Sequence, residues 1–217
     1  MADELDWAAQ SEQGLLKAAL AHAPRLGWTR RMVGAAARDC GFSDPEAELL
    51  LPHGARDLAA LMARRHDRIA LEALADFDQS RMKVRERIRL AVLTRCETAL
   101  ADEAALRRWA GFLALPGNLT LALRLVWASA DSLWRWAGDT ATDENHYSKR
   151  ALLAEILVTT LAVRLASGAA AATAHLDGRI AGVMAFEKWK AAIKPFRTAT
   201  RVAAALGRLR YGAAAAD

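Results

Sequence analysis

The chain has 217 residues, 53% of them hydrophobic and 25% charged, so it can fold around a sizeable core and wholesale disorder is excluded. Its net charge of +5 suggests an anionic partner, and both nucleic acid and anionic lipid head groups fit that description. The position of the charge along the chain has to decide between them.

The N-terminal part of the chain is predicted to form four helices punctuated by glycine and proline. Pro24 and Gly27 should end the first helix, and Thr29 and Ser43 should cap the second and third. Gly54 should open a long fourth helix. The expected ranges are about 6–23, 29–40, 43–51 and 54–77.

Helical periodicity continues through the rest of the chain, and no run alternates as a strand would. A polar connection over 138–145 interrupts it. The fold class is therefore all-α, a bundle of about ten helices with a C-terminal amphipathic helix. The further helices are expected at about 83–100, 103–114, 116–137, 146–166, 169–191 and 197–210.

Residues 27–58 resemble the helix-turn-helix of TetR-type repressors, with a Gly-x-Thr start, small residues at 35–37 and a turn around Gly41. Between Ser43 and His53 this segment has three carboxylates and no Lys or Arg. Phosphates would repel those carboxylates, so we favour a retained fold that does not bind nucleic acid. A ligand-responsive TetR-type regulator is the alternative.

The helices expected at about 116–137 and 146–166 carry long apolar stripes. Such stripes are typical of a packed core, and also of an apolar pocket between bundle helices. Small residues such as Ala122, Ala130 and Ala154 would leave room for a lipid chain. The candidate lipid-binding residues are Leu119, Leu123, Val126, Trp127, Ala130, Leu153, Ile156, Leu157 and Thr160.

Aromatic and charged residues cluster where these two helices join. Carboxylates at a helix start stabilise it by capping, whereas a patch that docks a partner would also explain the two tryptophans just before. Both interpretations remain open. The candidate partner-binding residues are Trp134, Trp136, Asp139, Asp143, His146, Tyr147 and Arg150.

The C-terminal segment is strongly basic, with seven Lys or Arg and no acidic residue over 188–216. On a helical wheel the arginines and the apolar residues separate, as in helices that lie on membrane surfaces. A helix packed on the body with a solvated basic face would show the same pattern. The candidate membrane-binding residues are Arg197, Arg201, Val202, Leu206, Arg208 and Leu209.

No catalytic or metal-binding motif is present, so we expect no enzyme activity, metal or cofactor. The five histidines lack ligand spacing, and His66 with Asp67 is interpreted as a solvated pair. Cys40 and Cys96 are expected to be small buried thiols in a reducing compartment. The longest uncharged run, 109–123, is too short to span a membrane, which favours a soluble or peripheral protein.

Two stretches resemble the Coq-nine family, lipid-binding accessory proteins of ubiquinone biosynthesis. The first is LGWTRR at 26–31 followed by GFSDPEAELLLPHGARDLA at 41–59. The second is an aromatic-rich helix, then Gly-Asp-x-x-x-Asp at 138–143, then Tyr147 and the basic pair Lys149 and Arg150. The resemblance covers about residues 11–195, with His146 standing where many relatives have Trp.

This resemblance implies a TetR-like fold whose cavity holds a lipid or isoprenoid, in a homodimer. It implies that the protein presents a polyprenyl quinone precursor to the di-iron demethoxyubiquinone hydroxylase, without chemistry of its own. We therefore expect a peripheral protein on the cytoplasmic side of the inner membrane. The expected division is a helix-turn-helix-like lobe at 1–53, a lipid-binding body at 54–194 and a membrane-binding helix and tail at 195–217.

Overall fold

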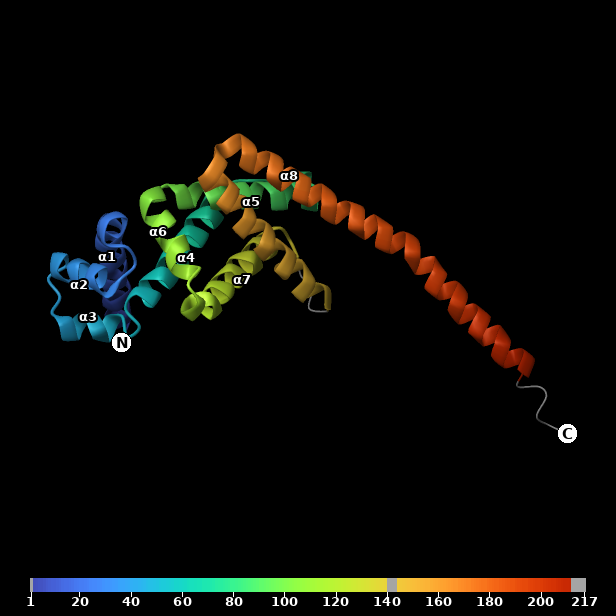
Figure 1. Cartoon of the computed structure of the whole chain (residues 1–217), viewed down its shortest axis with the longest axis horizontal. Helices are drawn as coiled ribbons and strands as arrows, with labels where there is room; N and C mark the ends of the chain where they lie inside the picture. Colours follow the sequence, from blue (N-terminus) through green and yellow to red (C-terminus); the bar gives the residue numbers. More distant parts are fainter. Residues whose placement is uncertain (1, 140–143, 212–217) are drawn as a thin grey trace. The chain divides into compact units, whose positions relative to one another are not determined.

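A computed structural model describes residues 2–139 and 144–211, with side chains described for 7–139 and 147–185. All secondary structure in these ranges is helical, which confirms the all-α class (Figure 1). The chain divides into two compact units, Met1–Ala174 and His175–Asp217. The elements are α1 (Ala2–Leu26), α2 (Arg30–Asp39), α3 (Asp44–Leu50), α4 (Ala55–Leu74), η1 (Gln79–Arg81), α5 (Val84–Leu100), α6 (Glu103–Leu113), η2 (Pro116–Asn118), α7 (Leu119–Trp136) and α8 (Glu144–Tyr211).

The helix caps near the N-terminus follow from local sequence. Thr29 accepts a hydrogen bond from the backbone N–H of Met32 at 3.3 Å, and the backbone N–H of Ser43 donates to Glu46 Oε2 at 2.8 Å, as the capping signals predict. The first helix was expected to end at about residue 23, stopped by Pro24 and Gly27; the role of Gly27 is confirmed, and the end at residue 23 was wrong. The helix continues through Pro24 to Leu26, and the chain turns at Gly27, where φ is 66°.

The N-terminal lobe packs α1 against α2 through fully buried residues such as Leu16, Ala19 and Ala36. The small residues of α2 allow this close approach. Trp28 joins the lobe to the body, because its indole N–H donates to the Ala105 carbonyl in α6 at 3.2 Å. The lobe therefore shares one apolar core with α4 and α6.

Helix α8 differs from the three helices expected over this range. The predicted break near residue 168 is confirmed, since Gly168 has non-helical angles of φ 86° and ψ −176°. The predicted break around Pro195 was wrong, because the backbone stays helical through it. Proline removes a hydrogen bond and kinks a helix, but it does not have to end it.

Within α8, the stretch Tyr147–Ala185 is long and apolar enough to cross a membrane, judged by length and composition only. Only 28% of its most apolar window is buried. Searching for uncharged runs missed this stretch, because isolated charges such as Glu155 and Arg164 interrupt it. A core helix passes the same test, so the stretch is a candidate for lipid contact on grounds of composition alone.

Candidate functional site

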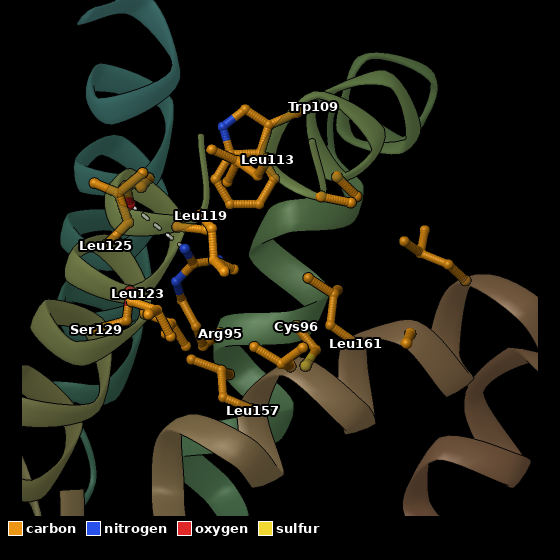
Figure 2. A pocket seen from close by; sticks show the side chains of 18 residues that line it. Arg95, Cys96, Trp109, Leu113, Leu119, Leu123, Leu125, Ser129, Leu157 and Leu161 are labelled. Carbon is orange, nitrogen blue, oxygen red and sulfur yellow. Dashed lines mark hydrogen bonds between the residues drawn. The ribbon is translucent and has the colours of Figure 1, made fainter. Parts of the chain in front are cut away.

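An apolar pocket of about 350 Å³ opens between α5, α6, α7 and the first part of α8 (Figure 2). All of its lining lies within the unit Met1–Ala174. Its size is at the lower end for ligand pockets in proteins, which are mostly apolar with a few placed polar groups. The lining residues are Ala63, Arg95, Cys96, Trp109, Ala110, Leu113, Ala114, Leu119, Ala122, Leu123, Leu125, Val126, Ser129, Leu157, Val158, Leu161, Ala162 and Leu165.

The pocket lies beside a sharp bend in the chain, where α6 and α7 meet at 95° across η2. Arg56 of α4 fixes this bend: its Nε donates to Asn118 Oδ1 at 2.9 Å, and its Nη2 donates to the Gly117 carbonyl. Asn118 in turn donates to the Phe112 carbonyl at 2.9 Å. Alanines such as Ala122 then line the space between the helices without filling it.

The mouth of the pocket is apolar as well as its walls. Leu119, Leu123 and Val158 line the pocket and are each more than half exposed to solvent. An exposed apolar patch that continues into a cavity marks a binding site more often than an isolated surface leucine does. The geometry therefore suits an apolar molecule that enters from the surface.

One polar cluster contributes to the wall. Arg95 is 6% exposed, and its Nε donates to Asp67 Oδ1 at 2.5 Å. The Ser129 hydroxyl lies 2.7 and 2.8 Å from the two Asp67 oxygens. In Figure 2 the Arg95 side chain extends from α5 into the pocket, and the dashed line marks its hydrogen bond to the Ala63 carbonyl of α4. The cluster brings a cation into an otherwise apolar cavity.

The structure brings four of the nine candidate lipid-binding residues to the pocket wall, and their role in binding stays a prediction. Trp127 instead packs against Tyr147, with ring centroids 6.2 Å apart. The other four, Ala130, Leu153, Ile156 and Thr160, are buried but do not line the pocket. The four that line it are Leu119, Leu123, Val126 and Leu157.

Sequence reasoning missed the contributions of α5 and α6 to the pocket. The apolar line on α5 that includes Cys96 was visible in the sequence, but it did not show which cavity it would face. Trp109 of α6 gave no such signal, and its indole N–H is used to donate to the Ala59 carbonyl at 3.1 Å. Burial raises the pKa of Cys96 to about 12, so its thiol stays protonated and unreactive.

The candidate partner-binding residues of α7 make contacts within the chain. The indole N–H of Trp134 donates to the Lys149 carbonyl at 2.9 Å, and that of Trp136 donates to the Leu74 carbonyl at 3.2 Å. Trp134 also lies under the Lys149 ammonium, 5.7 Å from the ring centroid. These tryptophans therefore help to fix α7 to its neighbours, and their docking role stays a prediction.

Charges complete the connection between α7 and α8. Arg150 is 2% exposed and pairs with both Asp131 and Asp139, while Lys149 Nζ lies 2.7 Å from Asp139 Oδ1. Burial alone would raise the pKa of Asp139, but the hydrogen bonds and charges of Lys149 and Arg150 hold it below its usual range. Asp139 thus joins two helices, which differs from simple capping.

Of the remaining candidate partner-binding residues, one has an exposed side chain and two have side chains outside the described residues. Tyr147 is 65% exposed. Asp143 lies outside the described residues, and so does the side chain of His146. The same holds for the six candidate membrane-binding side chains, whose backbone belongs to α8: Arg197, Arg201, Val202, Leu206, Arg208 and Leu209.

The interpretation of His66 as solvated was wrong. It is 2% exposed, and neither ring nitrogen has a hydrogen-bond partner among the residues that the structure describes. Burial lowers the pKa of His66 to about 4, and the nearby charges of Arg95 and Arg65 add to the effect. Its Nε2 lies 3.7 Å from Asp102 Oδ2, an attraction that does not outweigh the burial. His66 is therefore a neutral core residue.

Comparisons with known proteins converge on one family. Residues 119–187, which are α7 and the first part of α8, match a model of the COQ9 family. "Ubiquinone biosynthesis protein COQ9, mitochondrial" of Homo sapiens is 29% identical over 157 residues, covering 70% of this chain and 49% of that protein. The Rattus norvegicus protein of the same name is 31% identical, covering 70% of this chain and 50% of that protein.

A third relative, "Ubiquinone biosynthesis protein COQ9-B, mitochondrial" of Xenopus laevis, is 28% identical over 172 residues, covering 72% of this chain and 55% of that protein. The chain thus spans about half the length of the curated relatives it matches. The region matched by the family model contains all of the pocket-lining residues of α7 and α8 and the charged connection between those helices.

Proposed function

We propose that this chain, a member of the COQ9 family, acts in ubiquinone biosynthesis as a non-catalytic accessory protein that binds a lipid or isoprenoid. The pocket between α5, α6, α7 and α8 holds the apolar chain of a quinone precursor. The protein presents this precursor to the di-iron demethoxyubiquinone hydroxylase at the membrane, as a homodimer and without nucleic acid.

The observation that carries the proposal is the apolar pocket with its open mouth. Of its lining residues only Arg95 is charged, and the walls are otherwise almost wholly aliphatic, aromatic or alanine. Each Å² of apolar surface removed from water contributes about 25 cal/mol. A branched hydrocarbon chain meets such walls without burying a polar group, whereas a sugar or nucleotide would not.

The surface around the mouth supports a peripheral membrane location. Leu119, Leu123 and Val158 are exposed there, and Val158 belongs to the apolar stretch Tyr147–Ala185 of α8. The basic residues of 188–211 would add attraction of about 1 kcal/mol each at an anionic surface. We place the protein on the cytoplasmic side of the inner membrane, although the curated relatives are named as mitochondrial.

The exposed ring of Tyr147, which lies tilted against Trp127, is the feature of the α7–α8 junction that suits a partner. The rest of that junction is occupied by contacts within the chain. We therefore assign the hydroxylase contact to the surface around Tyr147. Trp134, Trp136, Asp139 and Arg150 contribute indirectly, because their contacts within the chain hold α7 and α8 in place.

The acidic surface of α3 argues against binding of nucleic acid. Asp44, Glu46 and Glu48 are all exposed. Hydrogen bonds from the hydroxyl and the backbone N–H of Ser43 lower the pKa of Glu46, so this carboxylate stays ionised. A recognition helix with these charges would be repelled by phosphates.

The proposal is tested by native mass spectrometry and lipid extraction on protein purified from a ubiquinone-producing host. The expected result is one isoprenoid or phospholipid per chain. Ala122→Trp, which fills the pocket, should lose it, whereas Ala104→Trp on the exposed side of α6 should keep it. Lipid-free wild-type protein, or lipid retained equally by both variants, would contradict the proposal.

A further inference from the structure

The pocket contains one charged side chain whose hydrogen-bonding capacity is only partly used. Arg95 Nε donates to Asp67 Oδ1, and Nη2 reaches the Ala63 carbonyl at 3.5 Å, the outer limit of a hydrogen bond. Nη1 donates no hydrogen bond within the part of the chain that the structure describes. An arginine side chain carries five N–H groups, so donors remain available on the wall of the cavity.

The charge of Arg95, unlike its donors, is already balanced. Asp67 lies against the guanidinium and is only 14% exposed, and the Ser129 hydroxyl donates to its carboxylate from 2.7 and 2.8 Å of the two oxygens. Ser129 thus positions the carboxylate that neutralises Arg95. A second anion in the pocket would be brought close to Asp67 in surroundings that solvate charge poorly.

Three classes of apolar ligand would meet this cluster differently. A pure hydrocarbon would cover the free N–H groups without satisfying them, which is costly. A fatty acid would satisfy them but would add a carboxylate beside Asp67. A neutral molecule with one acceptor oxygen, such as a ketone, a quinone carbonyl or an ether, would satisfy the donors and leave the charge balance unchanged.

We propose that Arg95 is the residue that determines specificity in this pocket, and that it selects apolar chains ending in a neutral acceptor oxygen. The oxygen is held at the guanidinium while the chain lies along the walls of α7 and α8 toward Leu119 and Leu123. This inference rests on the proposed function, because it requires that the pocket binds an apolar ligand.

The first test uses wild-type protein and a matched ligand series: pristane, and the methyl ketone and carboxylic acid with the same branched skeleton. Binding is followed by displacement of the neutral dye Nile red. The ketone should bind about tenfold more tightly than pristane, the gain from one hydrogen bond to a charged donor, and more tightly than the acid at neutral pH.

Equal affinities for ketone and pristane, or tighter binding of the acid, would overturn the role of Arg95 while leaving the pocket as a lipid site. If none of the three displaces the dye, the pocket proposal itself fails. The two failures are therefore distinguishable.

Variants assign the preference to the residue. In Arg95→Met the tenfold preference for the ketone should disappear, because pristane no longer covers unsatisfied N–H groups and should bind at least as tightly as it binds wild type. Arg95→Lys keeps the charge beside Asp67 but lacks the planar fork, and it should show a reduced preference with the fold retained by circular dichroism. In the control Leu123→Ala, both ligands should weaken by the same factor. A full ketone preference in both Arg95 variants would overturn the proposal.

Discussion

Two buried arginines in this protein have opposite surroundings. Arg150, at the α7–α8 junction, is 2% exposed and lies between two carboxylates, Asp131 and Asp139. Arg95, on α5, is 6% exposed, has one carboxylate partner in Asp67, and lines a cavity. The same side chain thus serves as a cross-link in one place and as a donor facing a ligand space in the other.

The difference shows how a buried charge can be classified by its surroundings. An arginine enclosed by two carboxylates has its charge and several donors engaged, so its removal would mainly affect folding. An arginine with a single carboxylate, beside apolar space, also retains donors for a ligand, so its removal should affect binding as well as folding. The following experiments would break or sharpen that distinction.

The largest expected effect is on stability at the α7–α8 junction. Arg150→Met leaves Asp131 and Asp139 without their buried partner, so the free energy of unfolding should fall by about 3–5 kcal/mol. Urea denaturation followed by circular dichroism measures it. A loss below 1 kcal/mol would show that Arg150 is not the cross-link described.

The next effect is a dependence of stability on pH that separates the two regions. The folded pKa of His66, near Arg95, is lowered to about 4 from 6.5, so the unfolded chain takes up a proton first as the pH falls. Stability from His66 is therefore complete above about pH 6.5 and lost toward pH 4, on the order of 3 kcal/mol. The pKa of Asp139 is lowered from 3.8, so its contribution is lost only below that value.

Urea denaturation at a series of pH values measures both windows. His66→Gln should flatten the dependence between pH 6.5 and 4, and Asp139→Asn should flatten it only in stronger acid. If His66→Gln leaves the upper window unchanged, His66 is not buried as a neutral residue.

A smaller effect is expected from Ser129→Ala beside Arg95. The variant removes one hydrogen bond to Asp67 but keeps the ion pair, so the free energy of unfolding should fall by about 1 kcal/mol. The ketone preference should also weaken, because Asp67 is less well positioned. Thermal denaturation with the same dye displacement assay measures both; a change in stability with no change in preference would separate Ser129 from the ligand site.

The smallest effect is expected at the surface of the α7–α8 junction. Arg135 contacts the same Asp131 as Arg150 does, but it is 72% exposed. Arg135→Ala should change the free energy of unfolding by less than about 0.5 kcal/mol, because exposed ion pairs contribute little. A loss comparable to that of Arg150→Met would mean that burial does not explain the difference.

Local features of the fold were predictable from sequence because their causes are local. The caps at Thr29 and Ser43 depend on side chains within three residues, and the positive φ of Gly41 depends on the missing Cβ. The break near Gly168 has the same origin. The wrong prediction at Pro195 has a local reason too, since a proline can kink a helix without ending it.

The site was only partly predictable because it depends on contacts distant in sequence. The stripe of α7 identified Leu119, Leu123 and Val126, but periodicity does not say which buried residue faces a cavity and which faces another helix. Thr160 shows this limit, because it is fully buried and does not line the pocket. The roles of Arg95 and Arg150 appear only once their carboxylates, 28 and 19 residues away, are placed beside them.

The most direct test of the account is photoaffinity labelling with an isoprenoid ketone that carries a diazirine along its chain, mapped by peptide mass spectrometry. We predict labels on the peptides that contain residues 109–129 and 157–165, competed away by the unlabelled ketone and lost in Ala122→Trp. Labelling confined to other parts of the chain, or unaffected by competitor and by Ala122→Trp, would contradict the claim that this pocket binds a lipid.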